Sequence, residues 1–131
     1  MDMNVKEYLK KDRFAALLGI ELLEAANGSA KAKLIIEDKH LNAMNTVHGG
    51  TIFSLADLTL AAAANSYGSV AVVINANISF LKAVNKGTLY AEVNETSRNS
   101  KIAYYTITIT DSQAELISSM QGMVYIKKEF V

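Results

Sequence analysis

The chain has 131 residues, half of them hydrophobic, and its 13 basic residues balance 13 acidic ones to give a formal net charge of zero. These values predict one domain, residues 1–131, with its own hydrophobic core, and they give no sign of a nucleic-acid partner. The absence of Cys excludes disulfides, thiolate metal sites and cysteine nucleophiles.

The first residues carry no signal-peptide pattern, and the apolar runs are too short and too interrupted to span a bilayer. We therefore expect a soluble, cytoplasmic protein without a membrane partner. The two histidines, His40 and His48, have no neighbour at a metal-ligand spacing. No metal and no cofactor is expected.

The N-terminal part predicts a helix followed by a β-hairpin. Apolar residues recur at mostly helical spacing over Val5–Leu18, and Gly19 is typical of a helix end. Residues 20–26 and 29–36 have the composition of strands, and Asn27-Gly28 between them is a strong hairpin signal. Residues 37–47 are polar and irregular, which predicts a connection into the next helix.

The central stretch, Thr51–Ala64, predicts a helix of about four turns that is apolar nearly all round and therefore buried. Gly49-Gly50 precede it. Because glycines place no side chain in front of the first N–H groups, we expect this helix start to be bare and to attract negative charge.

One residue does not suit a buried helix, and it is Asp57. Burying an uncompensated carboxylate costs several kcal/mol unless the group is protonated, so a functional role is indicated. Steps of three and four residues along the helix join Asp57 to other small or polar residues. This stripe, which we expect to face a partner helix or a ligand channel, consists of Gly50, Ser54, Asp57, Ala61 and Asn65 or Ala64.

Four strands are predicted after the helix. The first, Ser69–Phe80, places Val70, Val72, Ile74, Ala76, Ile78 and Phe80 on one face and polar residues on the other. Short turns separate it from the strands at 88–96, 101–110 and 116–127. Strands joined by short turns are antiparallel neighbours, and only the central helix is large enough to cover them. The sequence predicts an α+β fold, an antiparallel sheet wrapped around one long central helix.

Three segments together resemble one family. They are LNAMNTVHGG at 41–50, LAD at 55–57 and NISFLK at 77–82. The spacing from His48 to Asp57, with Asn42 upstream, makes the match specific. The chain resembles the hotdog-fold acyl-CoA thioesterases of the phenylacetic acid degradation type over most of its length, from about Phe14 to Lys127.

The resemblance implies a role for several positions. Asp57 would activate a water or attack the thioester itself, and the Gly49 N–H would hold the thioester oxygen. Asn42 and His48 would help to place substrate or water. Gly50 and Ser54 of the helical stripe, together with Val73, are further candidates for contact with the substrate. The resemblance also implies an acyl-CoA substrate bound across a homodimer, with two dimers pairing into a tetramer.

Some features leave alternatives open. Some relatives carry a polar residue that helps to orient the water where this chain has Val73, so this chain departs from the family at the water's second anchor. Without the motif, Gly49-Gly50 is equally consistent with a tight turn, His48 with a structural histidine, and Asn42 with an ordinary loop residue. Lys82, Arg98 and Lys101 are either solvated charges or contacts for the phosphates of coenzyme A.

Two functions compete as a result. The first is hydrolysis of a small or medium acyl-CoA, aromatic or straight-chain. The second is a non-catalytic acyl-CoA or acyl-carrier binding module on the same fold, which Val73 favours and Asp57 disfavours. A hotdog dehydratase is a weaker third reading, because no matching pair of His and acid is present.

Overall fold

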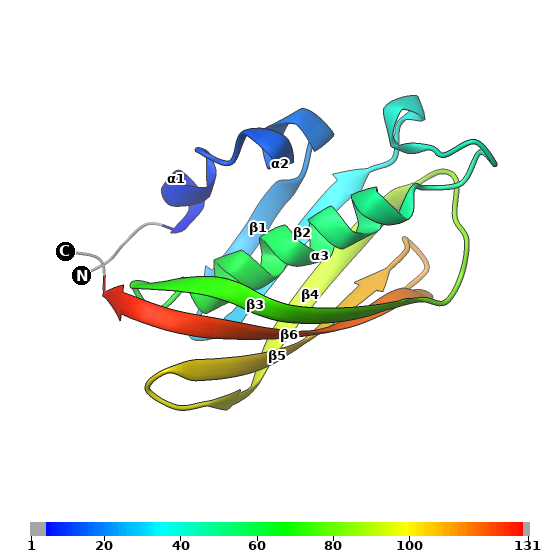
Figure 1. The fold of residues 1–131 in the computed structure, drawn as a ribbon. Coiled ribbons are helices and arrows are strands. Elements are labelled where there is room, and N and C mark those ends of the chain that lie inside the picture. Colours follow the sequence, from blue (N-terminus) through cyan, green and yellow to red (C-terminus); the bar gives the residue numbers. More distant parts are fainter. Residues whose placement is uncertain (1–4, 130–131) are drawn as a thin grey trace.

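The computed structural model describes residues 5–129, which form a curved six-stranded sheet, one long helix and shorter helices (Figure 1). In chain order the elements are α1 (Val5–Leu9), α2 (Arg13–Leu18), β1 (Glu21–Ala26), β2 (Ser29–Ile35), η1 (Asp38–His40), α3 (Gly49–Ala64), β3 (Ser69–Phe80), β4 (Thr88–Arg98), β5 (Ile102–Thr110) and β6 (Leu116–Glu129). None of the helices in residues 5–129 combines the length and apolar character needed to cross a bilayer.

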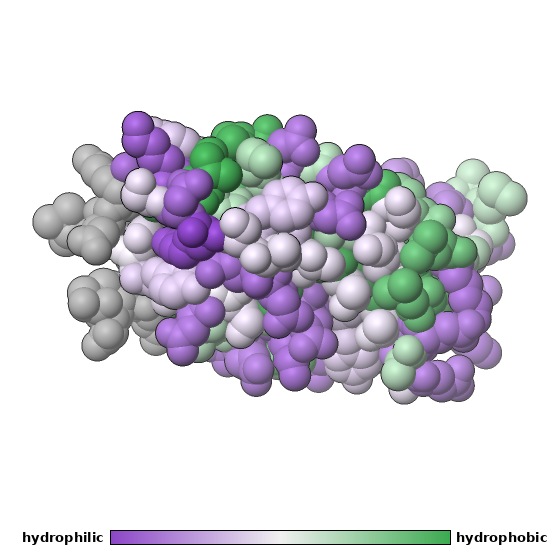
Figure 2. Space-filling view, turned by 90° about the horizontal axis from the view of Figure 1, so that it is seen from below, coloured by the Kyte–Doolittle hydropathy of each residue, from purple (hydrophilic) through white to green (hydrophobic). Residues whose placement is uncertain are grey.

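All neighbouring strands are antiparallel, in the order β1-β2-β4-β5-β6-β3. The sheet curves around α3, and α1 and α2 lie above β1 beside that helix (Figure 1). The predicted α+β fold with a central helix is therefore confirmed. The prediction that strands joined by short turns are neighbours is wrong for β3 and β4, because β3 pairs with β6 and β4 lies between β2 and β5. The molecule seen from below is mainly hydrophilic across its middle, with hydrophobic residues both toward the end at which α3 begins and along the upper edge toward the opposite end (Figure 2).

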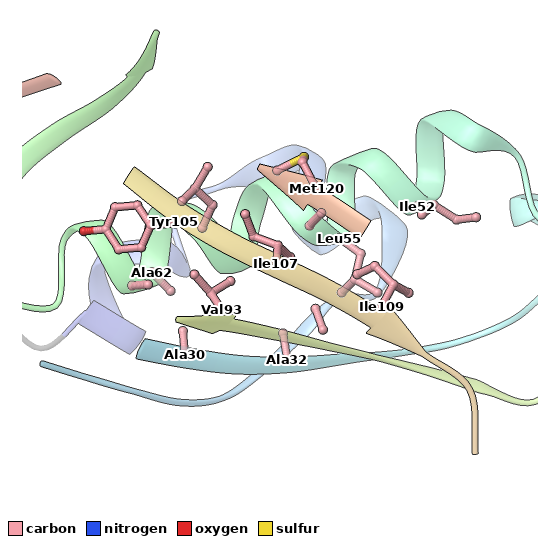
Figure 3. Close-up of a cluster of buried hydrophobic side chains, with 14 of the residues drawn as sticks. Ala30, Ala32, Ile52, Leu55, Ala62, Val93, Tyr105, Ile107, Ile109 and Met120 are labelled. Atoms are coloured by element: carbon pink, nitrogen blue, oxygen red, sulfur yellow. The ribbon is translucent and has the colours of Figure 1, made fainter. Parts of the chain in front are cut away.

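The core fills the space between α3 and the sheet (Figure 3). Leu55 and Leu60 of α3 and Tyr105 and Ile107 of β5 are fully buried. Each such apolar side chain contributes about 1.5–3 kcal/mol by leaving water. Gly122 of β6 permits the close approach, because a Cβ there would lie 2.5 Å from the Cδ2 of Leu60.

The predicted single helix over Val5–Leu18 is wrong, because two helices form there. Asp12 lies between them as the N-cap of α2, and its Oδ1 accepts a hydrogen bond from the Ala15 N–H at 2.9 Å. A side chain that caps a new helix start interrupts the preceding one. The predicted end at Gly19 is confirmed, since Gly19 has φ 81°.

The hairpin between β1 and β2 is confirmed. Asn27 and Gly28 have φ 52° and 83°, so both central residues are left-handed, as in the type I′ turn that Asn-Gly favours. The second position also has no room for a side chain. A Cβ on Gly28 would lie 2.6 Å from the hydroxyl of Tyr67.

The bounds predicted for β3 are confirmed, and the predicted apolar face is confirmed at Ala76 and Ile78 but wrong for the first half of the strand. The pairing with β6 shifts between Val73 and Asn75, where a β-bulge changes which side chains face the core. Ala71 and Val73 before the bulge, and Ala76 and Ile78 after it, pack against the core. Val72 and Ile74 are consequently exposed, at 43% and 52%.

Candidate active site

The start of α3 is built by a histidine cap. His48 is the N-cap residue, and its Nδ1 accepts a hydrogen bond from the Gly50 N–H at 2.8 Å. The expectation of a start with no side chain in front of it is therefore wrong. The neighbouring Gly49 N–H, however, has no acceptor among residues 5–129. This N–H lies at the positive end of the helix dipole, where it can bind an anionic oxygen.

A cavity of about 410 Å³ adjoins the start of α3. It brings together three residues expected in the site, Asn42, Gly49 and Lys82. Phe80, at the end of β3, forms one wall, and its ring would lie 3.2 Å from a Cβ added to Gly49. Because glycine has no Cβ at this position, the Phe80 ring can pack against Gly49 and the Gly49 N–H stays accessible from the cavity.

Asn42 shapes the loop that leads to this cavity. Its Oδ1 accepts hydrogen bonds from the N–H groups of Met44 and Thr46, at 2.9 and 3.2 Å. Asn45, inside the loop, has φ 61°, a conformation that Asn tolerates better than most residues. The amide oxygen of Asn42 is thus engaged with the loop, as expected of a loop residue, while Asn42 also lines the cavity.

Asp57 lines a second cavity, of about 220 Å³, on another side of α3. Its other walls include Asp12, Phe14, Phe53 and Ser54. No group among residues 5–129 donates a hydrogen bond to the Asp57 carboxylate, because the Ser54 hydroxyl donates to the Gly50 carbonyl at 2.7 Å. Burial, and secondly the negative charge of Asp12, raise the pKa of Asp57 above its ordinary value of 3.8. An acid with these properties is a candidate general base.

The predicted stripe on α3 is the least buried face of that helix. Gly50 is exposed, and Ser54, Asp57 and Ala61 are half-buried, while most other residues of α3 are buried. At the helix end Asn65 is buried instead, because its amide donates to the Ala61 carbonyl at 2.8 Å and accepts from the Ala71 N–H at 3.1 Å. The stripe therefore reaches from Gly50 to Ala61.

A third cavity, of about 460 Å³, lies between the N-terminal helices, β1 and α3. It shares Asp12, Ala15, Ile20 and Leu58 with the Asp57 cavity. The two cavities therefore adjoin. Leu9, Ala16 and Leu22 add further apolar surface to the larger one.

One protomer does not bring the three basic residues Lys82, Arg98 and Lys101 together. Lys82 lines the cavity at the start of α3, whereas the Arg98 guanidinium stacks at 4.0 Å on Tyr67, which follows the end of α3. A helix of 16 residues separates these ends by roughly 24 Å. Lys82 is paired with Glu115 at 2.5 Å and Arg98 with Glu95 at 3.3 Å. Lys101 is exposed in the turn between β4 and β5.

Val73 is half-buried against the core and lines none of the three cavities. Its apolar side chain could not anchor a water by hydrogen bonding. No group of three or more His, Asp or Glu residues among the described part of the chain has a geometry suited to a metal ion.

Two residues of the site were not expected from the sequence. Asp12 was assigned to the middle of a helix, although its position before the Arg13–Leu18 segment is a possible N-cap signal. Phe80 was assigned to a strand face only. Nothing local in the sequence indicates that its ring packs over Gly49, because that contact depends on the loop between β3 and β4.

Comparison with known proteins places the chain in a family. Residues 44–118 match the thioesterase superfamily. A protein from Archaeoglobus fulgidus whose name proposes an esterase is 42% identical over 123 residues, covering 92% of this chain and 80% of that protein. The Escherichia coli protein named acyl-coenzyme A thioesterase PaaI is 31% identical over 120 residues, covering 91% and 86%.

Solved structures give the same fold. The structure of E. coli PaaI superposes with a TM-score of 0.92 at 28% identity, covering 96% of this chain and 92% of that one. A Streptococcus pneumoniae protein described as a hypothetical thioesterase and solved with coenzyme A has a TM-score of 0.86 at 18% identity, covering 94% of this chain and 99% of that one. The chain belongs to the thioesterase superfamily, as a hotdog-fold thioester hydrolase related to PaaI.

Proposed function

We propose that this protein hydrolyses acyl-CoA thioesters, with Asp57 as the general base or the nucleophile and the Gly49 N–H as the oxyanion donor. As base, Asp57 removes a proton from a water whose oxygen attacks the thioester carbon. As nucleophile, its carboxylate attacks that carbon and water then hydrolyses the anhydride. In both routes the carbon–sulfur bond breaks, and coenzyme A leaves as the thiol after taking up a proton.

The observation that carries the proposal is a carboxylate with a raised pKa on the same helix as an N-terminal N–H without an acceptor among residues 5–129.

The two groups must come from different subunits. Gly49 and Asp57 are separated by about 12 Å along the axis of α3, at about 1.5 Å per residue, and they line different cavities. An oxyanion donor lies about 3 Å from the oxygen, and a general base is within hydrogen-bond reach of the attacking water. One subunit therefore cannot supply both groups to one carbonyl. We infer a homodimer in which Asp57 of one subunit faces Gly49 of the other.

Strand β3 supports such a dimer. It lies at one edge of the sheet, and the bulge exposes Val72 and Ile74 there. A long unpaired edge with apolar side chains is suited to pairing with a second copy of itself. The further pairing into a tetramer remains a prediction, which light scattering at micromolar concentration can test.

Two observations support coenzyme A as the thiol part of the substrate: the relatives and the position of Lys82. One relative is named an acyl-coenzyme A thioesterase, and a protein of the same fold was solved with coenzyme A. Lys82 lies on the wall of the Gly49 cavity, where its ammonium group can reach a phosphate. Arg98 and Lys101, at the other end of the sheet, could contact the same molecule only from the partner subunit.

The alternative of a non-catalytic acyl-CoA binding module is favoured by Val73 alone. Free-thiol release from acetyl-, phenylacetyl- and decanoyl-CoA separates the two functions, with Asp57→Asn as the matched control. An enzyme releases thiol from at least one ester, and the variant loses that activity. If the parent binds acyl-CoA in calorimetry but releases no thiol from any ester, the proposed hydrolysis is wrong and the binding module is correct.

A further inference from the structure

We infer that the cavity between the N-terminal helices and α3 receives the acyl chain, which assigns straight-chain acyl groups of medium length as the preferred substrates. The inference rests on the proposed function, because it takes Asp57 as the position of the reacting carbonyl. It concerns the cavity of about 460 Å³ lined by α1, α2, β1 and Leu58 of α3.

The first observation is continuity with the candidate base. The Asp57 cavity shares Ala15, Ile20 and Leu58 with the larger cavity. A carbonyl held at Asp57 therefore has an apolar route leading away from it, under α2. In the proposed dimer, Asp57 faces Gly49 of the other subunit, and the space at Gly49 belongs to a different cavity, so it remains for the thiol part of a substrate.

The second observation is size. The Asp57 cavity, at about 220 Å³, holds about seven groups of the volume of a water molecule, roughly 30 Å³ each. An acetyl group fills little of this space. A chain of about eight carbons or more fills it and continues into the larger cavity.

The third observation is the chemistry of the lining. Leu9, Ile20, Leu22 and Leu58 provide apolar surface. The same cavity is also lined by charged residues, which are engaged with protein partners: Lys6, Glu7, Lys10, Asp12 and Glu21. Lys10 pairs with Glu7 at 2.9 Å, Glu21 with Lys33 at 3.8 Å, and Asp12 caps α2. The part of the cavity formed by Leu9, Ile20, Leu22 and Leu58 is therefore suited to methylene groups.

The small side chains of α2 leave this space open. Ala15 is buried between the two cavities, while Ala16 is exposed and lines only the larger one. A large side chain at position 16 would fill the larger cavity without changing the walls around Asp57. Leu17, on the same helix, is 66% exposed and lines none of the three cavities, so it provides a matched control.

The test compares acetyl-CoA with decanoyl-CoA in the parent, Ala16→Trp and Leu17→Trp proteins. The parent should prefer decanoyl-CoA. Ala16→Trp should lower kcat/KM for decanoyl-CoA at least about tenfold, the effect expected from losing about two buried methylenes, and should leave acetyl-CoA within about twofold. Leu17→Trp should change neither value. An unchanged decanoyl-CoA activity in Ala16→Trp, or no preference in the parent, would overturn the inference.

Calorimetric measurement of decanoic acid binding tests the acyl cavity without any need for thioester hydrolysis. The parent and Leu17→Trp proteins should bind it, and Ala16→Trp should bind it at least about tenfold more weakly. If no acyl-CoA is hydrolysed, the proposed function fails, but this binding pattern would still support the cavity as an acyl site. Equal binding by all three proteins would overturn it.

Discussion

The Nδ1 atom of His48 accepts a hydrogen bond from the Gly50 N–H at 2.8 Å, immediately beside the N–H of Gly49, which has no acceptor among residues 5–129. The first turn of α3 therefore divides its donors between two purposes. The Gly50 N–H is held by the His48 cap, which stabilises the helix start. The Gly49 N–H remains open to a ligand oxygen. A pair of substitutions at Gly49, one that deletes the N–H and one that keeps it, can isolate the effect of this N–H on activity.

The first prediction concerns Gly49→Pro, which deletes the N–H and leaves the helix in place. Gly49 is the first residue of α3, where proline is well tolerated, and His48 has the extended conformation that precedes proline (φ −60°, ψ 135°). Loss of one oxyanion donor should lower kcat by about 10²–10³-fold. Steady-state thiol release, with circular dichroism to verify the fold, measures the effect.

Gly49→Ala is the matched control for the proline variant. Both substitutions place a Cβ against the Phe80 ring, which must move by a few tenths of an ångström, but only alanine keeps the N–H. Alanine should therefore retain most of the activity. Equal losses in the two variants would mean that crowding by Phe80, and not the N–H, is responsible.

The second prediction concerns Asp57→Asn, which keeps the shape of the side chain but removes both base and nucleophile. It should lower kcat on the best acyl-CoA by at least about a hundredfold. A well-folded variant with close to the parent rate would assign the chemistry to another group, such as His48.

Stability measurements serve as the control for this variant. The pKa of Asp57 is raised in the folded protein, so the native state binds the proton more tightly than the unfolded state. Its ionisation therefore reduces the free energy of unfolding as the pH rises from the ordinary value of 3.8 through the raised pKa. At neutral pH Asp57→Asn should melt at or above the parent temperature, and the difference should shrink at acidic pH. A variant that melts well below the parent at neutral pH would indicate a structural aspartate.

The third prediction concerns Asp12→Asn. The charge of Asp12 is one cause of the raised pKa of Asp57, so its removal should lower that pKa. The acidic limb of the pH profile of kcat/KM should then shift to lower pH. Asparagine caps helices as well as aspartate does, so α2 should be retained. Asp12→Ala, which loses the cap, should destabilise the protein by about 1 kcal/mol. A profile that is the same in Asp12→Asn and the parent would exclude this charge from the site.

The fourth prediction concerns the basic residues. If Lys82 contacts a phosphate of coenzyme A, Lys82→Ala should raise KM about fivefold, for a contact of about 1 kcal/mol, with kcat nearly unchanged. The same should hold for Arg98→Ala and Lys101→Ala if they act from the partner subunit. A pantetheine thioester of the same acyl group lacks the phosphates of coenzyme A. Its KM should therefore be the same for these variants and the parent. Lys86→Ala, in the same loop and outside the cavity lining, is the control for Lys82. Unchanged KM values for acyl-CoA would remove these residues from the phosphate site.

Local patterns were sufficient for much of the fold and for part of the site. Asn27-Gly28 predicted its hairpin, and the apolar run after Gly50 predicted the central helix, because both depend on nearby residues alone. The bulge in β3 could not be predicted, since it is set by the pairing with β6 and an alternating sequence is equally compatible with either face. The adjacency of Asp12 and Asp57 depends on how the N-terminal helices pack over α3. The His48 cap is not indicated by the sequence, because Ser, Thr, Asp and Asn are the usual N-cap residues and histidine is not among them.

The most direct test of a site shared by two subunits is complementation between Asp57→Asn and Gly49→Pro. Each homodimer should be almost inactive. When the two chains are mixed by co-expression or by unfolding and refolding, half of the dimers are hybrids, and each hybrid has one site with both groups intact. Thiol release should then recover to about a quarter of the parent rate. If Asp57 and Gly49 act within one subunit, no hybrid has an intact site, and a mixture as inactive as the separate variants would contradict the account.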